Sequence, residues 1–230
     1  MALNATLLQL RNRARRRADI EKFTDRFPDP ELNDEINESI ARLYAILVSN
    51  RGVGYYETST TFNTVAGTAQ YALPDDFMAL TSLETVISGS NVYLRSYGQM
   101  DRPWLKNISD WSLANMAPLY RLRGNYVDFA PVPNAAYPVT MCYVPAPAPL
   151  TTDQMSFDGI CGFEEWVVLD VARKCMQKDD RDASSILAER AKIEDEIAKE
   201  SPYRDGANPE RVTDRGYVDV GVAGAWWGVR

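Results

Sequence analysis

The clearest structural signal in this chain is DPELNDEINESIARLYAILVSN at residues 29–50. Apolar side chains recur in it every three or four residues, which is the spacing of one helix face: Leu32, Ile36, Ile40, Leu43, Tyr44 and Leu47. Asp29 followed by Pro30 is a typical helix start, and Gly52 and Gly54 follow the last apolar position. The stretch predicts an amphipathic helix that buries one face against partner elements.

Those partners are predicted on both sides of this helix, towards the two ends of the chain. Residues 5–18 contain strong helix formers and neither Gly nor Pro, which predicts a preceding helix. Residues 163–177 are densely apolar, and residues 183–199 are amphipathic, with a turn at residues 178–180 between them. The apolar positions of the last helix are Ile186, Leu187, Ile193 and Ile197. Two helical pairs from opposite ends of a chain bury their apolar faces best against each other.

Residues 53–150 have a different character, because Thr, Val, Tyr and Phe become frequent and turn residues recur. The predicted strands are residues 55–62, 69–73, 83–87, 92–97, 120–123, 126–129 and 139–144. Gly-containing turns at residues 89–91 and 124–125 predict hairpins, and prolines at residues 74, 131 and 133 interrupt strand pairing. Residues 109–116 are a candidate short helix.

These patterns predict an α+β fold in which a helical bundle, built from the N- and C-terminal helix pairs, carries a β-rich insertion and an extended C-terminal tail. We expect the helical core at residues 1–52 and 160–201, the insertion at residues 53–159 and the tail at residues 202–230.

The composition excludes several classes of function. The chain has no histidine, so a Ser–His–Asp or Cys–His catalytic set cannot form. No C-x-x-C pair occurs among the three cysteines, Cys142, Cys161 and Cys175, and we expect all three to be reduced and buried. We expect neither a bound metal nor a cofactor. A formal net charge of −7 argues against a surface that grips nucleic acid. No apolar run reaches the length of a membrane span, so we expect that the protein does not bind or cross a membrane. We also expect it to be synthesised in a cytoplasm.

No pair of carboxylates is placed for catalysis by its spacing. Glu164 and Glu165 are adjacent on a predicted helix, so they project about 100° apart and cannot face one substrate together. We predict no catalytic residue, and leave open only a carboxylate pair assembled from distant segments, as in a glycosidase.

Five arginines in seven residues interrupt the acidic character of the chain: Arg11, Arg13, Arg15, Arg16 and Arg17. They cannot all share one helix face. We favour pairing of Arg13, Arg16 and Arg17 with carboxylates of a neighbouring subunit or another protein over contact with DNA, because the chain itself is acidic.

The last segment, residues 203–230, is rich in Gly and has no helical period. Trp226 and Trp227 are aromatic anchors of the kind that dominate protein interfaces. Tyr217, Val218 and Val220 belong to the same predicted interface, and the alternating valines could add a strand to the sheet of a partner. The alternative is that this segment folds back onto its own domain.

Several segments together resemble the head–tail adaptor (connector) proteins of tailed bacteriophages. The resemblance rests on LRNR at residues 10–13 through Ala18-Asp19, PELNDEIN at 30–37, YALPDDF at 71–77, YRLRGN at 120–125, SFDG at 156–159, FEEWVV at 163–168, ARK at 172–174 and KDDRDAS at 178–184. These segments cover most of the chain in order, and none is a catalytic motif.

The resemblance implies a structural virion protein, made in the bacterial host cytoplasm and located at the head–tail junction. Such proteins form a ring, commonly of 12 copies, that docks on the portal protein and serves as a platform for tail or nozzle proteins. DNA would pass through the channel without specific binding. Two alternatives stay open: a peptidoglycan hydrolase acting in cell-wall penetration, and a monomeric binding module.

Overall fold

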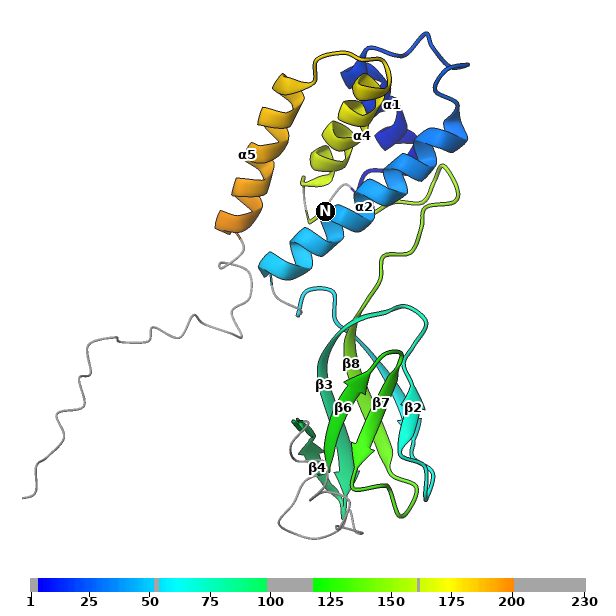
Figure 1. Ribbon diagram of the computed structural model, residues 1–230, viewed down its shortest axis with the longest axis vertical. Coiled ribbons are helices and arrows are strands. Elements are labelled where there is room, and N and C mark those ends of the chain that lie inside the picture. The colour runs from blue at the N-terminus through cyan, green and yellow to red at the C-terminus, as the bar shows by residue number, and fades with distance from the viewer. Residues whose placement is uncertain (1–3, 52–53, 99–117, 161, 201–230) are drawn as a thin grey trace, which may run out of the picture.

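The computed structural model describes residues 4–51, 54–98, 118–160 and 162–200, and within them it has a mixed α+β fold, which confirms the predicted class. The helices gather at one end of the molecule and the strands at the other (Figure 1). The helices are α1 (Leu7–Ala18), α2 (Asp29–Arg51), α4 (Glu164–Lys178) and α5 (Ser184–Glu200). The strands are β1 (Thr58–Asn63), β2 (Gln70–Ala72), β3 (Phe77–Ile87), β4 (Ser90–Tyr93), β5 (Arg95–Ser96), β6 (Leu119–Arg123), β7 (Tyr126–Ala130) and β8 (Pro138–Pro145). The candidate helix at residues 109–116 and the predicted tail lie outside the described residues.

The helices share one hydrophobic core. All six apolar positions predicted for α2 are at most 4% exposed, and they pack with buried residues of α1, α4 and α5. Helix α4 contacts α1, α2 and α5, which explains its dense apolar sequence. No helix in the described part of the chain is long and apolar enough to cross a membrane.

Two details of the helices differ from the sequence prediction. Helix α1 begins at Leu7 because Thr6 and Gln9 form a capping box, in which each side chain accepts the backbone N–H of the other residue. In α5, Ile186 and Ile197 are buried, but Leu187 is 43% exposed. The prediction for Leu187 was wrong because α5 packs through a narrow face, and Leu187 lies about 100° around the helix from Ile186.

The strands form two four-stranded sheets, with the orders β1-β8-β3-β4 and β2-β7-β6-β5. Alternate residues of β8, namely Val139, Met141 and Tyr143, are buried together with Val127 and Phe129 of β7. The two sheets therefore pack face to face around a second core. The hairpin between β3 and β4 turns at Ser88 and Gly89, whose positive φ angles of 52° and 80° fit a two-residue hairpin loop.

Two strand predictions need correction. Strand β3 begins at Phe77, six residues before the predicted start at residue 83, because its pairing with β8 continues through two register shifts. The single strand predicted at residues 92–97 is two strands: β4 pairs with β3 in one sheet, and β5 pairs with β6 in the other. Buried Leu94 lies between them, where the chain passes from one sheet to the other.

Two tyrosine hydroxyls form hydrogen bonds at the junction between the helices and the sheets. Tyr44 of α2 donates to the carbonyl oxygen of Pro145 at 2.8 Å. Tyr56, which precedes β1, donates to the carbonyl oxygen of Asp158 at 2.9 Å. Val144 of β8 belongs to the helical core. The segments that enter and leave the β-rich part therefore meet at its base.

Gly159 lies at this junction and leaves no room for a side chain. A Cβ atom at residue 159 would lie 2.8 Å from Cγ of Glu164 and 3.0 Å from its backbone nitrogen. The Glu164 carboxylate also accepts the N–H of Gly159, at 3.3 Å. We expect Gly159→Ala to lower the free energy of unfolding by about 1–3 kcal/mol, through overpacking, in urea denaturation. An unchanged unfolding midpoint would show that Glu164 moves aside freely.

Candidate functional site

Two of the five α1 arginines hold the helix in place. Arg11 is 6% exposed, and its guanidinium donates to Asn33 at 3.0 Å and to Asp153 at 3.1 Å. Arg15 donates to the carbonyl oxygen of Phe27 at 2.9 Å and pairs with Asp29 at 2.7 Å. These two arginines therefore fasten α1 to the start of α2 and to the segment before α4.

The other three arginines, Arg13, Arg16 and Arg17, are exposed on α1. Arg16 reaches Glu21 at 3.4 Å, and Arg17 pairs with Glu189 of α5. Among the residues that the structure describes, Arg13 forms no ion pair. Pairing of these side chains with another subunit stays a prediction. The rest of the predicted interface, Tyr217, Val218, Val220, Trp226 and Trp227, lies outside the described residues.

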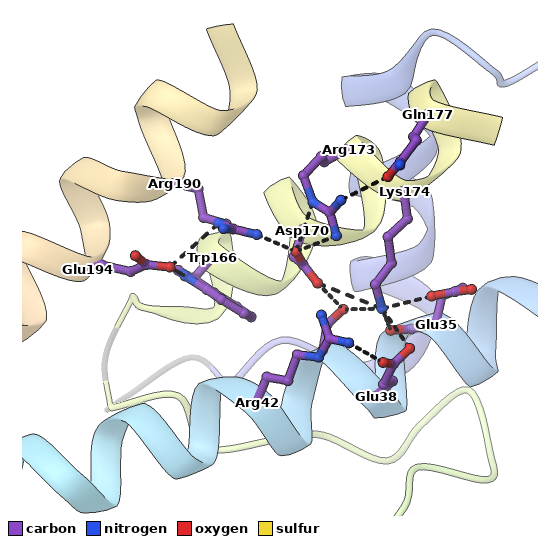
Figure 2. Close-up of polar contacts among 11 residues, drawn as sticks. Glu35, Glu38, Arg42, Trp166, Asp170, Arg173, Lys174, Gln177, Arg190 and Glu194 are labelled. Carbon is purple, nitrogen blue, oxygen red and sulfur yellow. Dashed lines mark hydrogen bonds and ion pairs between the residues drawn. The ribbon is translucent and has the colours of Figure 1, made fainter. Parts of the chain in front are cut away.

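A buried carboxylate that sequence reasoning missed connects three helices (Figure 2). Asp170 of α4 is 0% exposed. It accepts the hydroxyl of Ser39 at 2.8 Å, Arg190 at 2.6 Å and Arg173 at 3.2 Å. The ammonium of Lys174 lies 3.7 Å from it. Three cations from α4 and α5 thus converge on one carboxylate beside α2.

These neighbours decide the charge of Asp170. Burial by itself raises the pKa of a carboxyl group, because it penalises the charged form. Here the hydrogen bond from Ser39 and the cations Arg173 and Lys174 outweigh burial and hold the pKa of Asp170 below its usual value. The carboxylate is therefore ionised at neutral pH.

The network extends from Asp170 to the neighbouring helices. Lys174 pairs with Glu35 at 2.7 Å and with Glu38 at 2.9 Å, both on α2. The indole N–H of Trp166 donates to Glu194 of α5 at 2.9 Å. The sequence offered one signal for this network: an aspartate inside an apolar helix, with cations three and four residues later.

An open groove of about 510 Å³ lies beside this network, between α2, α4 and α5. It is lined by Arg42, Arg173, Gln177, Asp180, Arg181, Ala183, Leu187 and Arg190. Four guanidinium groups and one carboxylate give the lining an excess of positive charge, and Leu187 adds exposed apolar surface. Such a lining suits a protein surface that carries carboxylates, because guanidinium groups bind them in a bidentate manner.

The carboxylates that the sequence analysis considered for catalysis do not form a pair. Glu164 is buried and its carboxylate accepts the Gly159 N–H, whereas the adjacent Glu165 is partly exposed. The described residues contain no cluster of metal-ligating side chains.

The two cysteines that the structure describes, Cys142 and Cys175, differ in burial. Burial raises the pKa of the Cys175 thiol to about 11, and Cys175 and Cys142 are both free. Cys142 is only partly buried, so the prediction of a buried thiol was wrong there, because it lies on β8 facing away from the core between the sheets. Cys161 lies outside the described residues.

A comparison with protein families identifies the family of this chain. The family model of the SU10 adaptor protein matches residues 5–213, which include all the described helices and strands. The chain belongs to the SU10 adaptor protein family. This confirms the resemblance to phage head–tail adaptors that the sequence showed. The comparison with curated proteins gives no match.

Membership of the SU10 adaptor family gives the chain a structural role at the head–tail junction of a tailed phage. The match gives no support to a peptidoglycan hydrolase. It also means that the exposed arginines of α1 and the arginine-lined groove belong to a protein that works in an assembly, so we consider both as surfaces for partners.

Proposed function

We propose that this SU10 adaptor forms a ring, of 12 copies by the family pattern, that docks beneath the portal and extends the DNA channel. The four helices would form the bundle of the ring body, at residues 1–52 and 160–201, and residues 53–159 would be the β-rich insertion. Tail or nozzle proteins would bind to the opposite side. The observation that carries this proposal is the family match over residues 5–213.

The charge of the chain supports a channel through which DNA slides. A formal net charge of −7 means that many copies around one axis repel the DNA backbone rather than bind it. Exposed arginines lie on α1 and four arginines line the groove, where the acidic surface of another copy or of the portal would be a complementary partner. The adaptor would be made in the host cytoplasm and would act without a cofactor.

Negative-stain images of the protein with and without the portal test this function. We expect portal particles to carry a full ring of adaptor density, because one head-to-tail interface repeated around an axis closes. A portal particle that binds only one or two copies would contradict the proposal. A protein that stays a monomer with the portal would favour a free-standing binding module.

The exposed arginines of α1 provide a further prediction. Replacing Arg13, Arg16 and Arg17 by Gln should weaken ring formation, and the loss should be greater at low salt, where exposed ion pairs are least screened. Sedimentation of portal–adaptor mixtures over a range of salt concentrations measures the effect.

The control is a variant with the same loss of charge elsewhere, in which the exposed Arg95, Lys192 and Lys199 are replaced by Gln. It should assemble as the wild type does. If the α1 variant assembles normally while genome retention fails, its arginines face the DNA instead.

A further inference from the structure

The two sheets protect their edges differently. The sheet β2-β7-β6-β5 ends in strands of three and two residues, and very short edge strands offer little to a foreign strand. The sheet β1-β8-β3-β4 ends in β1, with six residues, and β4, with four. Their sequences, TSTTFN and SNVY, contain no charged residue and no proline, which are the usual means of blocking an edge. Within the residues that the structure describes, no further strand pairs with the outer side of β1 or of β4.

The hydrogen bonds of β1 show which residues face outward. The N–H of Thr64, just after β1, donates to the carbonyl oxygen of Tyr137 at 2.9 Å. Because alternate residues of a strand face opposite neighbours, the even-numbered residues of β1 bond to β8. Ser59, Thr61 and Asn63 therefore direct their N–H and C=O groups away from β8, and all three are exposed.

The same argument defines the free side of β4. The N–H of Leu94 donates to the carbonyl oxygen of Leu83 of β3 at 2.9 Å. Val92 therefore faces β3, and Asn91 and Tyr93 direct their backbone groups outward. Tyr93 is also 66% exposed, more than any other large hydrophobic side chain that the structure describes, and aromatic side chains are enriched at protein interfaces.

The directions of the strands make these two edges complementary. Every neighbouring pair in the order β1-β8-β3-β4 is antiparallel, so β1 and β4 run in opposite directions. A second copy placed beside the first in the same orientation brings its β4 antiparallel to β1 of the first copy. The alternation of the sheet then continues without interruption.

We propose that β1 of one copy pairs with β4 of the next copy around the ring, so that this sheet continues from subunit to subunit. The pairing is head-to-tail, as a closed ring requires. It places outward-facing Thr61 opposite Tyr93 or Asn91 and covers the exposed Tyr93 ring. This inference rests on the proposed function for the ring itself and adds the surface by which the copies contact one another.

Cysteine cross-linking on portal-bound adaptor tests the pairing. Residues directly opposite in a hydrogen-bonded antiparallel pair have Cα atoms about 5.5 Å apart, which a disulfide can span. Because Thr61 lies opposite either Tyr93 or Asn91, two double variants are needed, Thr61→Cys/Tyr93→Cys and Thr61→Cys/Asn91→Cys. After mild oxidation, one of them should give a ladder of covalent multimers on a denaturing, non-reducing gel. A mixture of the corresponding single variants should stop at dimers.

The controls separate this inference from the proposed function. Wild-type protein, in which Cys175 is buried and Cys142 partly buried, should stay monomeric on the same gel, as should each single variant. Dimers from Thr61→Cys alone would indicate β1–β1 pairing and overturn the inference. Rings that are visible on the portal but give no ladder with either double variant would overturn it while leaving the proposed function intact. If no ring forms at all, both fail.

A backbone substitution tests the same edge without new cysteines. Thr61→Pro removes the outward N–H, and proline is tolerated on an edge strand. We expect it to lower the affinity between neighbouring copies by about tenfold, as for the loss of one hydrogen bond. Thr61→Val keeps the N–H and should assemble normally. Equal assembly by both folded variants would contradict the pairing.

Discussion

Replacing Asp170 by alanine should lower the free energy of unfolding by about 3–5 kcal/mol, the range expected when one partner of a buried ion pair is removed. The substitution leaves Arg173, Lys174 and Arg190 without their shared carboxylate, and Ser39 without its acceptor. These cations are 12–25% exposed, so partial hydration favours the lower end of the range. Urea denaturation followed by circular dichroism measures the change.

The matched control is Asp195→Ala on α5, which breaks an exposed pair with Lys199. It should leave the unfolding midpoint nearly unchanged, because exposed pairs are screened by water and salt. A similar loss of stability in both variants would show that the effect of Asp170→Ala comes from helix propensity and not from the buried network.

A pH series gives an independent measurement of the same carboxylate. Because its pKa is lowered in the folded protein, ionised Asp170 contributes stability above the pKa of the unfolded state and loses it as the pH falls through the folded pKa. The advantage of wild type over Asp170→Asn should be complete above about pH 4 and shrink below it. A difference that does not change with pH would contradict the ionised state.

Removing residues 213–230 should abolish stable binding to the portal and leave thermal unfolding nearly unchanged. The residues of both described cores lie between Ala5 and Ile197, so the deletion removes none of them. Trp226 and Trp227 can each bury about 150–250 Å² against a partner. Pull-down with the portal and differential scanning calorimetry measure the two effects.

The double substitution Trp226→Ala/Trp227→Ala in the full chain is the matched control, because it keeps the length of the segment. It should reproduce most of the binding loss if the two tryptophans are the anchors. A strongly destabilised truncated monomer would show that these side chains belong to its own core, and the assignment to an interface would then be wrong.

Regular periodicity made the helices and most strands predictable from sequence. The α2 positions Leu32 to Leu47 repeat at helical spacing and are buried as expected. Long-range pairing was not predictable: β3 extends back to Phe77 only because β8 lies beside it. The change of sheet at Leu94 likewise depends on two separate partners.

The candidate site was less predictable than the fold. The arginine cluster of α1 is visible in the sequence, but the structural role of two of its members is not. Arg11 and Arg15 hold the helix in place through residues 12 to 142 positions away. Asp170 gathers its partners from three helices, and the residues Ser39 and Arg190 are 131 and 20 positions from it in sequence. Such a network is defined by packing, which local sequence patterns do not contain.

The junction between the helices and the sheets, where Tyr44 and Tyr56 donate their hydroxyl hydrogen bonds, also affects which sequence changes the chain tolerates. The Tyr56 hydroxyl donates a hydrogen bond to the carbonyl oxygen of Asp158, so the start and the end of the β-rich part are held together beside the helices. With respect to the helices, the β-rich part is therefore equivalent to a long loop whose two ends are fixed. The entropy of closing a loop grows only slowly with its length. Insertions, deletions or exchange of whole hairpins beyond this point therefore leave the helical contacts in place, so the β-rich end can change in sequence while the helical end stays constant.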